Sequence, residues 1–135
     1  MYYGFDIGGT KIAFAVYDGG LNLCHEERMS TPGNDYEGLQ QLICQRVLEA
    51  DARFSARGAV GIGFPGILNR HDHSIVAANL PSINGRHLGA DLAERLGRMV
   101  KVDNDANCFL WSEVHQGAAA GADSALGVTI GTGIG

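Results

Sequence analysis

Glycine clusters at the ends of apolar runs constrain the fold of this chain more than any other feature. The chain has 20 glycines, and they form clusters at 8–9, 19–20, 61–66 and 127–135, where apolar stretches end. Glycine at the end of a strand permits special turns, or lets the backbone come close to a ligand. The pattern therefore predicts short strands whose ends form turns or a binding surface, and it does not resemble a flexible linker.

Apolar periodicity predicts how strands and helices alternate between these clusters. Three apolar runs at the start, separated by tight turns, are typical of an antiparallel meander. Asn34, with Glu37 in capping-box position, predicts the start of a helix that buries the stripe from Leu39 to Phe54. A third helix is expected to place Phe109 and Trp111 in the core. The predicted strands are 2–7, 11–17, 21–29, 59–63, 99–103 and 124–130, and the predicted later helices are 88–96 and about 106–114.

The order of these elements predicts an α/β fold. Strands that alternate with helices favour parallel pairing, so a mixed sheet with helices on both faces is expected. The chain stops in a glycine-rich loop directly after an apolar strand, which would leave an exposed edge. We therefore expect residues 1–135 to be the N-terminal part of a longer protein.

Composition excludes several classes of function. Fifteen acidic and ten basic residues give a formal charge of −5, whereas a general nucleic-acid binder is basic. No apolar run is long enough to span a membrane, and the first residues lack the basic and apolar regions of a signal peptide. Cys24, Cys44 and Cys108 are widely spaced and odd in number, as expected of free thiols in the cytoplasm. Neither nucleic acid nor a membrane is an expected partner.

One glycine motif is a weak signal. Residues 61–66 fit GxGxxG, but no helical pattern follows, and Arg86 stands where a dinucleotide site would need an acid. The chain also contains no Gly-Lys pair, so it has no P-loop. Both common nucleotide-binding motifs are therefore disfavoured.

The segments DIGGTK and GTGIG make a stronger case for a phosphate site. Successive backbone N–H groups in such loops point into one concavity that suits phosphate oxygens, and threonine hydroxyls add donors. An acid beside a phosphate cradle is explained if Mg²⁺ lies between them, bound to Asp6 through water. The alternative is two ordinary turns with solvated side chains. The expected residues are Asp6, Gly8, Gly9, Thr10 and Lys11 in the first loop, and Gly131, Thr132 and Gly133 in the second.

A third polar cluster, Asp103-Asn104-Asp105-Ala106-Asn107, stands where a strand gives way to a helix. Helix capping explains one such residue but not four. Asp105 is placed to accept a proton from a hydroxyl nucleophile, and Asn104 to hold that hydroxyl by a hydrogen bond. Phosphoryl transfer requires this combination together with a phosphate cradle and a metal ion.

Taken together, DIGGTK, GIGFPG, DNDANC and the final GTGIG resemble the ROK family of sugar kinases and sugar-responsive repressors over the whole chain. The resemblance implies an actin-like, ribonuclease-H-like fold with two lobes that close over ATP and a sugar. It implies that residues 1–118 form the small lobe, and that 119–135 form a hinge with the first strand and glycine loop of the second. It also implies that Asp105 is the general base for the 6-hydroxyl of N-acetyl-D-glucosamine.

The resemblance implies further binding groups. Asn104, Asp105, Gly66 and Asn79 fall where family members contact the sugar. ATP and Mg²⁺ are the implied cofactors, and the full-length protein is implied to be a homodimer. The ligands of the family's structural zinc lie beyond this chain, which provides no metal site of its own apart from Asp6.

Other functions remain open. Glucose is the main rival substrate, and N-acetylmannosamine a lesser one, since every kinase of the family would share the base and the cradle. A ROK-type repressor carries a helix-turn-helix before the DIGGTK-like segment, which here begins at residue 6. A non-catalytic nucleotide-driven binding module is a further alternative, and Asp105 argues against it.

Overall fold

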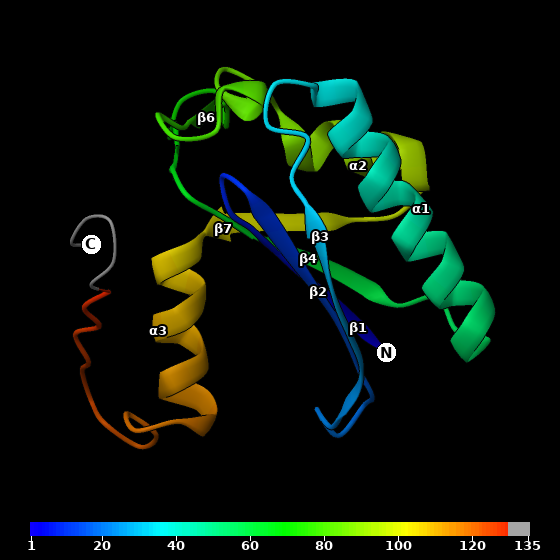
Figure 1. The fold of residues 1–135 in the computed structure, drawn as a ribbon. Helices are drawn as coiled ribbons and strands as arrows, with labels where there is room; N and C mark the ends of the chain where they lie inside the picture. The colour runs from blue at the N-terminus through cyan, green and yellow to red at the C-terminus, as the bar shows by residue number, and fades with distance from the viewer. Residues whose placement is uncertain (130–135) are drawn as a thin grey trace.

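In the computed structural model, residues 1–129 are described, and they form a mixed α/β layer structure (Figure 1). The main sheet has five strands in the order β3-β2-β1-β4-β7. The elements are β1 (Tyr2–Ile7), β2 (Lys11–Tyr17), β3 (Leu23–Ser30), α1 (Tyr36–Phe54), β4 (Ala59–Phe64), β5 (Ile67–Leu68), β6 (Ile75–Val76), η1 (Pro81–Ile83), α2 (Leu88–Leu96), β7 (Val100–Asn104) and α3 (Asp105–Gln116).

The pairing of the strands confirms the predicted meander followed by parallel strands. β1, β2 and β3 pair antiparallel, while β4 runs parallel to β1 and β7 runs parallel to β4. In each parallel unit a helix leads back to the start of the next strand, as the alternating order requires. The carboxyl ends of β1, β4 and β7 therefore meet at one edge of the sheet.

One face of the sheet forms the core. Alternate residues of β1 and β2, such as Phe5 and Phe14, are buried and their rings stack with centroids 4.5 Å apart. α1 and α2 cover this face, and α3 lies on the other (Figure 1). The residues between the buried ones, including Gly4 and Asp6, point to the α3 side. This is the period-two pattern expected of strands, and it orients Asp6 away from the core.

The helices begin and end close to the predicted residues, although α3 is longer than predicted at both ends and the N-cap of α1 differs by one residue. Asp35, not Asn34, is the N-cap of α1, and its side chain accepts a hydrogen bond from the N–H of Gly38 at 2.9 Å. Either residue type suits this position, so only the backbone geometry distinguishes them. α2 ends at Gly97, whose φ of 60° lies in the left-handed region that favours glycine.

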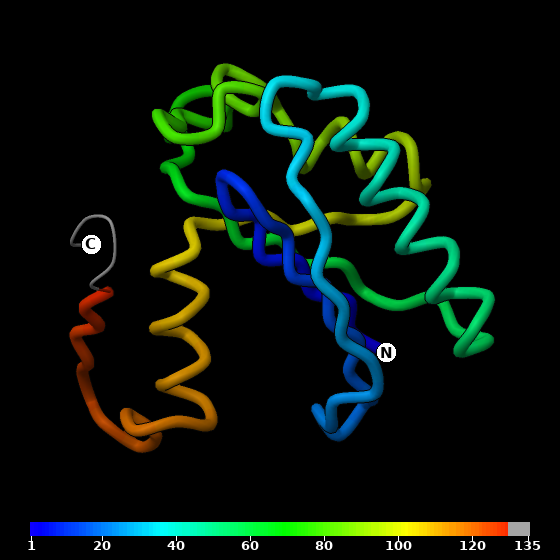
Figure 2. The backbone as a smooth tube through the Cα atoms, viewed as in Figure 1, coloured from blue at the N-terminus to red at the C-terminus, as the bar shows by residue number. Residues whose placement is uncertain are grey.

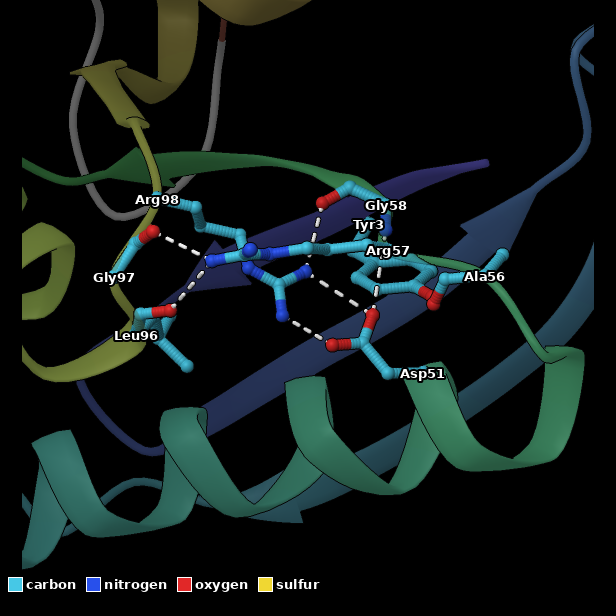
Figure 3. A network of polar contacts seen from close by, with 8 residues as sticks. All are labelled: Tyr3, Asp51, Ala56, Arg57, Gly58, Leu96, Gly97 and Arg98. Carbon is cyan, nitrogen blue, oxygen red and sulfur yellow. Dashed lines mark hydrogen bonds and ion pairs between the residues drawn. The ribbon is translucent and has the colours of Figure 1, made fainter.

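A network of ion pairs and hydrogen bonds connects the amino-terminal ends of β4 and β7 to α1 (Figure 3). The Arg98 guanidinium, beside the start of β7, pairs with Asp51 of α1 and donates to the carbonyl of Gly58 at 3.0 Å. Arg57 donates to the carbonyls of Leu96 and Gly97 at 3.3 and 2.5 Å. The Arg98 hydrogen bonds lower the pKa of Asp51, so its carboxylate is the favoured form in the fold.

The C-terminal part departs from prediction. No strand forms over residues 124–129, where the sequence predicted one from 124 to 130. Instead this segment runs back along α3 (Figure 2), and Gly127 lies against Phe109 and Leu110. A strand requires a neighbour with free backbone groups, which a helix does not offer. Trp111, expected in the core, is 69% exposed, because α3 contributes no buried residue to the described fold.

Two smaller findings complete the fold. The stretch 65–74, for which the sequence predicted no strand, carries β5, which forms a small hairpin with β6. Within the described part of the chain, no helix has the length and apolarity needed to cross a bilayer.

Candidate functional site

The predicted phosphate loop, Gly8–Thr10, joins β1 to β2. The N–H of Gly8 donates to the carbonyl of Lys11 at 2.8 Å, which closes the turn. Thr31, just after β3, holds the loop from outside. Its Oγ1 donates to the carbonyl of Gly8 at 2.7 Å, and its N–H donates to the carbonyl of Thr10 at 3.0 Å. The loop is therefore fixed at both ends, with Thr10 and Lys11 exposed to solvent.

A row of side chains crosses the sheet beside this loop. In the register of the parallel strands, Asp6 of β1 is opposite Gly63 of β4, and Gly63 is opposite Asp103 of β7. Asp105 follows β7 directly and begins α3. The glycine between the two aspartates has no side chain to separate them, so the carboxylates share one open edge of the sheet.

The electrostatics of this edge reflect the gathered carboxylates. Asp6 is solvent-exposed, yet the protein around it removes enough water to raise its pKa, and the negative charge of Asp105 raises it further. The pKa of the Cys108 thiol is raised by burial and then by the charges of Asp103, Asp105 and Asp6. A concentration of negative charge at this edge suits a bound cation or a proton-accepting role.

Asn104 connects β7 to the loop that follows β4. Its Oδ1 accepts from the N–H of Asn107 at 3.1 Å, so it is the N-cap of α3. Its Nδ2 donates to the carbonyl of Gly66 at 2.6 Å. A Cβ at Gly66 would lie 2.6 Å from the carbonyl oxygen of Val76, so only glycine fits there. Two residues predicted to contact a sugar are thus joined by a direct hydrogen bond.

Asn79 lies against the phosphate loop. A Cβ added to Gly9 would be 3.1 Å from the carbonyl oxygen of Asn79, so the two backbones approach closely at this point. Asn79 is exposed, on the segment that leads into η1. The predicted sugar-contacting and phosphate-binding segments therefore meet, although seventy residues separate Gly9 from Asn79 in sequence.

The structure brings most of the predicted site together. Asp6, Gly8, Gly9, Thr10 and Lys11 lie in one hairpin, and Gly66, Asn104 and Asp105 lie on the neighbouring strand ends, with Asn79 touching the hairpin. Gly131, Thr132 and Gly133 fall outside the described residues. Sequence reasoning missed Thr31, for which the sequence offers only a hydroxyl residue before a proline at a strand end.

A hollow beside the strand-end site shares two of its residues, Gly63 and Asp103. A groove of about 710 Å³ on the α3 side of the sheet is lined by Gly4, Gly61, Met99 and Trp111 among others. Its lining is mostly apolar, and a side chain at Gly4 or Gly61 would meet open space. It lacks the convergent polar groups of the strand-end site, so we take the strand ends as the candidate site.

Comparison with known proteins assigns the chain to a protein family. The chain matches the model of the ROK family over residues 2–135, and it belongs to that family. The mixed sheet with helices on both faces is the arrangement of ROK sugar kinases, which confirms the predicted actin-like α/β fold.

Individual relatives narrow the comparison. The N-acetyl-D-glucosamine kinase of Shigella boydii serotype 4 (strain Sb227) is 48% identical over 135 residues, which are 100% of this chain and 45% of that protein. The structure of the ROK hexokinase from Thermus thermophilus has a TM-score of 0.85 at 36% identity, covering 99% of this chain and 45% of that one. The ROK family glucokinase from Streptomyces griseus, in complex with glucose and AMPPNP, has a TM-score of 0.84 at 35% identity, covering 99% and 42%. The chain thus spans less than half the length of these relatives.

Proposed function

We propose that the protein carrying this chain is an ATP-dependent kinase that phosphorylates the 6-hydroxyl of N-acetyl-D-glucosamine. The observation that carries the proposal is the joining of Asn104 to Gly66 at the strand ends, with Asp105 beside them. The hydroxyl-binding groups and the proton acceptor then lie at the same sheet edge as the phosphate loop. This is the placement that phosphoryl transfer requires.

In this proposal the site residues form three groups: a proton acceptor, residues that orient the sugar, and residues that bind phosphate. Asp105 accepts the proton of the attacking hydroxyl, and Asn104, Gly66 and Asn79 orient the sugar. The N–H groups of Gly9 and Thr10 and the hydroxyl of Thr10 bind phosphate oxygens, and Lys11 supplies positive charge. The N–H of Gly8 shapes this loop by closing the turn on the carbonyl of Lys11. Gly131, Thr132 and Gly133 are proposed as a second phosphate loop on the basis of sequence alone.

Mg²⁺ fits this edge only as an ion shared with the nucleotide. Among residues 1–129 no group of three or more His, Cys, Asp or Glu side chains could hold a metal. The Asp6 carboxylate is exposed at the strand end and offers one ligand, directly or through water. Bound there with ATP, the ion would neutralise charge on the phosphates. Structural zinc remains an inference from the family.

The identity of the sugar is supported by similarity rather than by a pocket. The chain is 48% identical to an N-acetyl-D-glucosamine kinase, against 35% for the glucokinase of known structure. We therefore favour N-acetyl-D-glucosamine, with glucose as the second candidate. We favour a kinase over a repressor of the same family because the base, the sugar-contacting residues and the phosphate loop are all present.

The wider organisation is also a proposal. Residues 1–118 would be the small lobe, and residues 119–135 the hinge and start of a second lobe that completes the ATP site. The complete protein would be a homodimer. Because the three cysteines are free thiols, we place it in the cytoplasm.

The test is a sugar-kinase assay of the complete natural protein. ATP consumption is measured with N-acetyl-D-glucosamine, glucose and N-acetylmannosamine, and the product position is determined by NMR. We expect the highest kcat/KM for N-acetyl-D-glucosamine, with phosphate on the 6-hydroxyl. A higher value for glucose would favour the second candidate. Turnover of none of these sugars, by protein that is folded and binds nucleotide, would contradict the kinase.

A further inference from the structure

Thr31 makes an unusual pair of contacts for a residue outside the predicted site. It follows β3, and both its side chain and its backbone bond to the phosphate loop. Oγ1 donates to the carbonyl of Gly8 at 2.7 Å, and N–H donates to the carbonyl of Thr10 at 3.0 Å. With their carbonyls bonded to Thr31, Gly8 and Thr10 are fixed in orientation on either side of Gly9.

The next residues continue this contact toward the sugar. Gly33 lies against the loop, since a Cβ there would be 3.7 Å from the carbonyl oxygen of Gly9. The carbonyl of Gly33 in turn accepts a hydrogen bond from the N–H of Ser82 at 3.2 Å. Ser82 is 7% exposed and belongs to η1, three residues after Asn79. Residues 31–33, the bridge segment, thus contact both the phosphate loop and the segment 78–82, which we call the sugar loop.

We propose that the bridge segment couples the two loops and that Thr31 is a positioning residue for phosphate binding. The inference rests on the proposed function for its ligands, a sugar and a nucleoside triphosphate, but its contacts stand independently. A sugar held at Asn79 fixes the sugar loop, and with it Ser82 and Gly33. The phosphate loop is then held from two sides, by Thr31 and by the close approach of Gly9 to Asn79. Sugar and nucleotide should therefore each increase the affinity for the other.

The contact can be tested without catalysis. Thr31→Val keeps the shape of the side chain but removes the donor to the Gly8 carbonyl. Two controls are matched to it. Thr31→Ser retains the hydroxyl, and Ser30→Ala removes the exposed hydroxyl of the preceding residue. Hydrogen exchange of residues 8–11 is measured in the complete protein. We expect exchange about tenfold faster in Thr31→Val alone, and equal exchange in all variants would overturn the contact's role.

The functional consequence is tested by measuring the KM for ATP and the affinity for the sugar separately. Thr31→Val should raise KM for ATP about five- to tenfold while leaving the dissociation constant of the sugar, measured without nucleotide, within about twofold. In calorimetry with a non-hydrolysable ATP analogue, saturating sugar should lower the dissociation constant of the analogue in the wild-type protein. In Thr31→Val the ratio of the dissociation constants without and with sugar should be closer to one. Thr31→Ser should behave as wild type.

The outcomes separate this proposal from the kinase assignment. An active wild-type kinase whose KM for ATP is unchanged by Thr31→Val, or whose nucleotide affinity does not respond to sugar, would overturn the coupling and leave the kinase intact. A wild-type protein without kinase activity would end the kinase proposal. In that case, unaltered hydrogen exchange in Thr31→Val would also refute the positioning role of Thr31. Faster exchange would show that Thr31 still holds the loop of residues 8–11, whatever ligand that loop binds.

Discussion

The side chain of Asn104 bonds in two directions, from Nδ2 to the carbonyl of Gly66 at 2.6 Å and through Oδ1 to the N–H of Asn107 at 3.1 Å. One amide therefore caps α3 and holds the loop after β4. The helix that begins with Asp105 and the segment predicted to contact a sugar are fixed relative to each other by this single residue.

Asn104→Asp separates these two functions. Aspartate remains a good N-cap, but it cannot donate to the Gly66 carbonyl, and two acceptors then face each other. We expect little change in the melting temperature and a loss of sugar affinity of at least tenfold, measured by calorimetry. Asn104→Ala is the companion variant, which should lose sugar affinity and also about 1 kcal/mol of stability through loss of the cap. Wild-type sugar affinity in Asn104→Asp would refute the positioning role.

Asp105→Asn tests the base. The amide retains hydrogen bonding but cannot accept the proton, and general-base catalysis contributes about 10²- to 10⁴-fold. We expect kcat to fall by that order while the dissociation constant of the sugar changes less than about threefold. Steady-state kinetics and calorimetry on the complete protein measure both. Equal losses in rate and in sugar binding would show that Asp105 holds the sugar rather than activating it.

The same substitution should alter the titration of Asp6. Burial and the charge of Asp105 raise the pKa of Asp6, so ionised Asp6 disfavours the fold at neutral pH, and this penalty disappears as the pH falls below its unfolded value of about 4. Removing the Asp105 charge should lower the pKa of Asp6 and leave the neutral-pH melting temperature equal or higher. Carbon-detected NMR titration of the ligand-free protein measures the pKa. An unchanged Asp6 pKa in Asp105→Asn would contradict the interaction.

Gly66→Ala tests the close approach of Gly66 to the backbone of β6. The new Cβ would lie 2.6 Å from the carbonyl oxygen of Val76, so the β5–β6 hairpin must move. We expect a loss of about 1–3 kcal/mol in the free energy of unfolding, measured by urea titration, together with weaker sugar binding. Gly19→Ala is the matched control, since no atom lies within 4 Å of its Cβ, and it should change stability by less than about 0.5 kcal/mol. Similar effects of the two substitutions would contradict the packing argument.

The Arg98–Asp51 pair gives a prediction for pH. Side chains only 11% and 19% exposed form this pair, so Arg98→Met leaves a partly buried carboxylate without its cation. We expect a loss of about 2–4 kcal/mol at pH 7. Since the pKa of Asp51 is lowered in the fold, its contribution is present above the unfolded pKa of about 4 and is lost as pH falls through the folded value. The wild-type and Arg98→Met stabilities should therefore converge in acid. A constant difference from pH 7 down to pH 2 would exclude this linkage.

The parts of the fold that sequence reasoning obtained depend on local signals. Hairpins between neighbouring strands, the leucine stripe of α2 and its stop at Gly97 are all specified within a few residues. The placement of Asp6 and Asp105 at one edge of the sheet also follows from local signals, because each stands at or just after the end of an apolar strand and parallel strands bring such ends together. Their roles stay a prediction.

What sequence reasoning missed depends on contacts between distant segments. Thr31 reaches the phosphate loop only because β3 lies beside β2, so that its exit falls next to the β1–β2 turn. The predicted strand at 124–130 had the right composition, but a strand also needs a partner, which composition does not reveal. Trp111 and Phe109 have the character of core residues, yet both are exposed, because no residue of α3 is buried in the described part of the chain.

The Arg98 network stands at the entry of the parallel strands, whereas Asn104, Asp105 and the phosphate loop stand at their exit. The ion pair that anchors the sheet and the residues proposed to bind substrates thus lie at opposite ends of the strands. Under the proposed function, the loops that contact the sugar can therefore be exchanged while the anchoring residues stay unchanged. The same separation gives protein engineers a practical rule: specificity libraries belong at the strand exits, and stabilising substitutions at the entries.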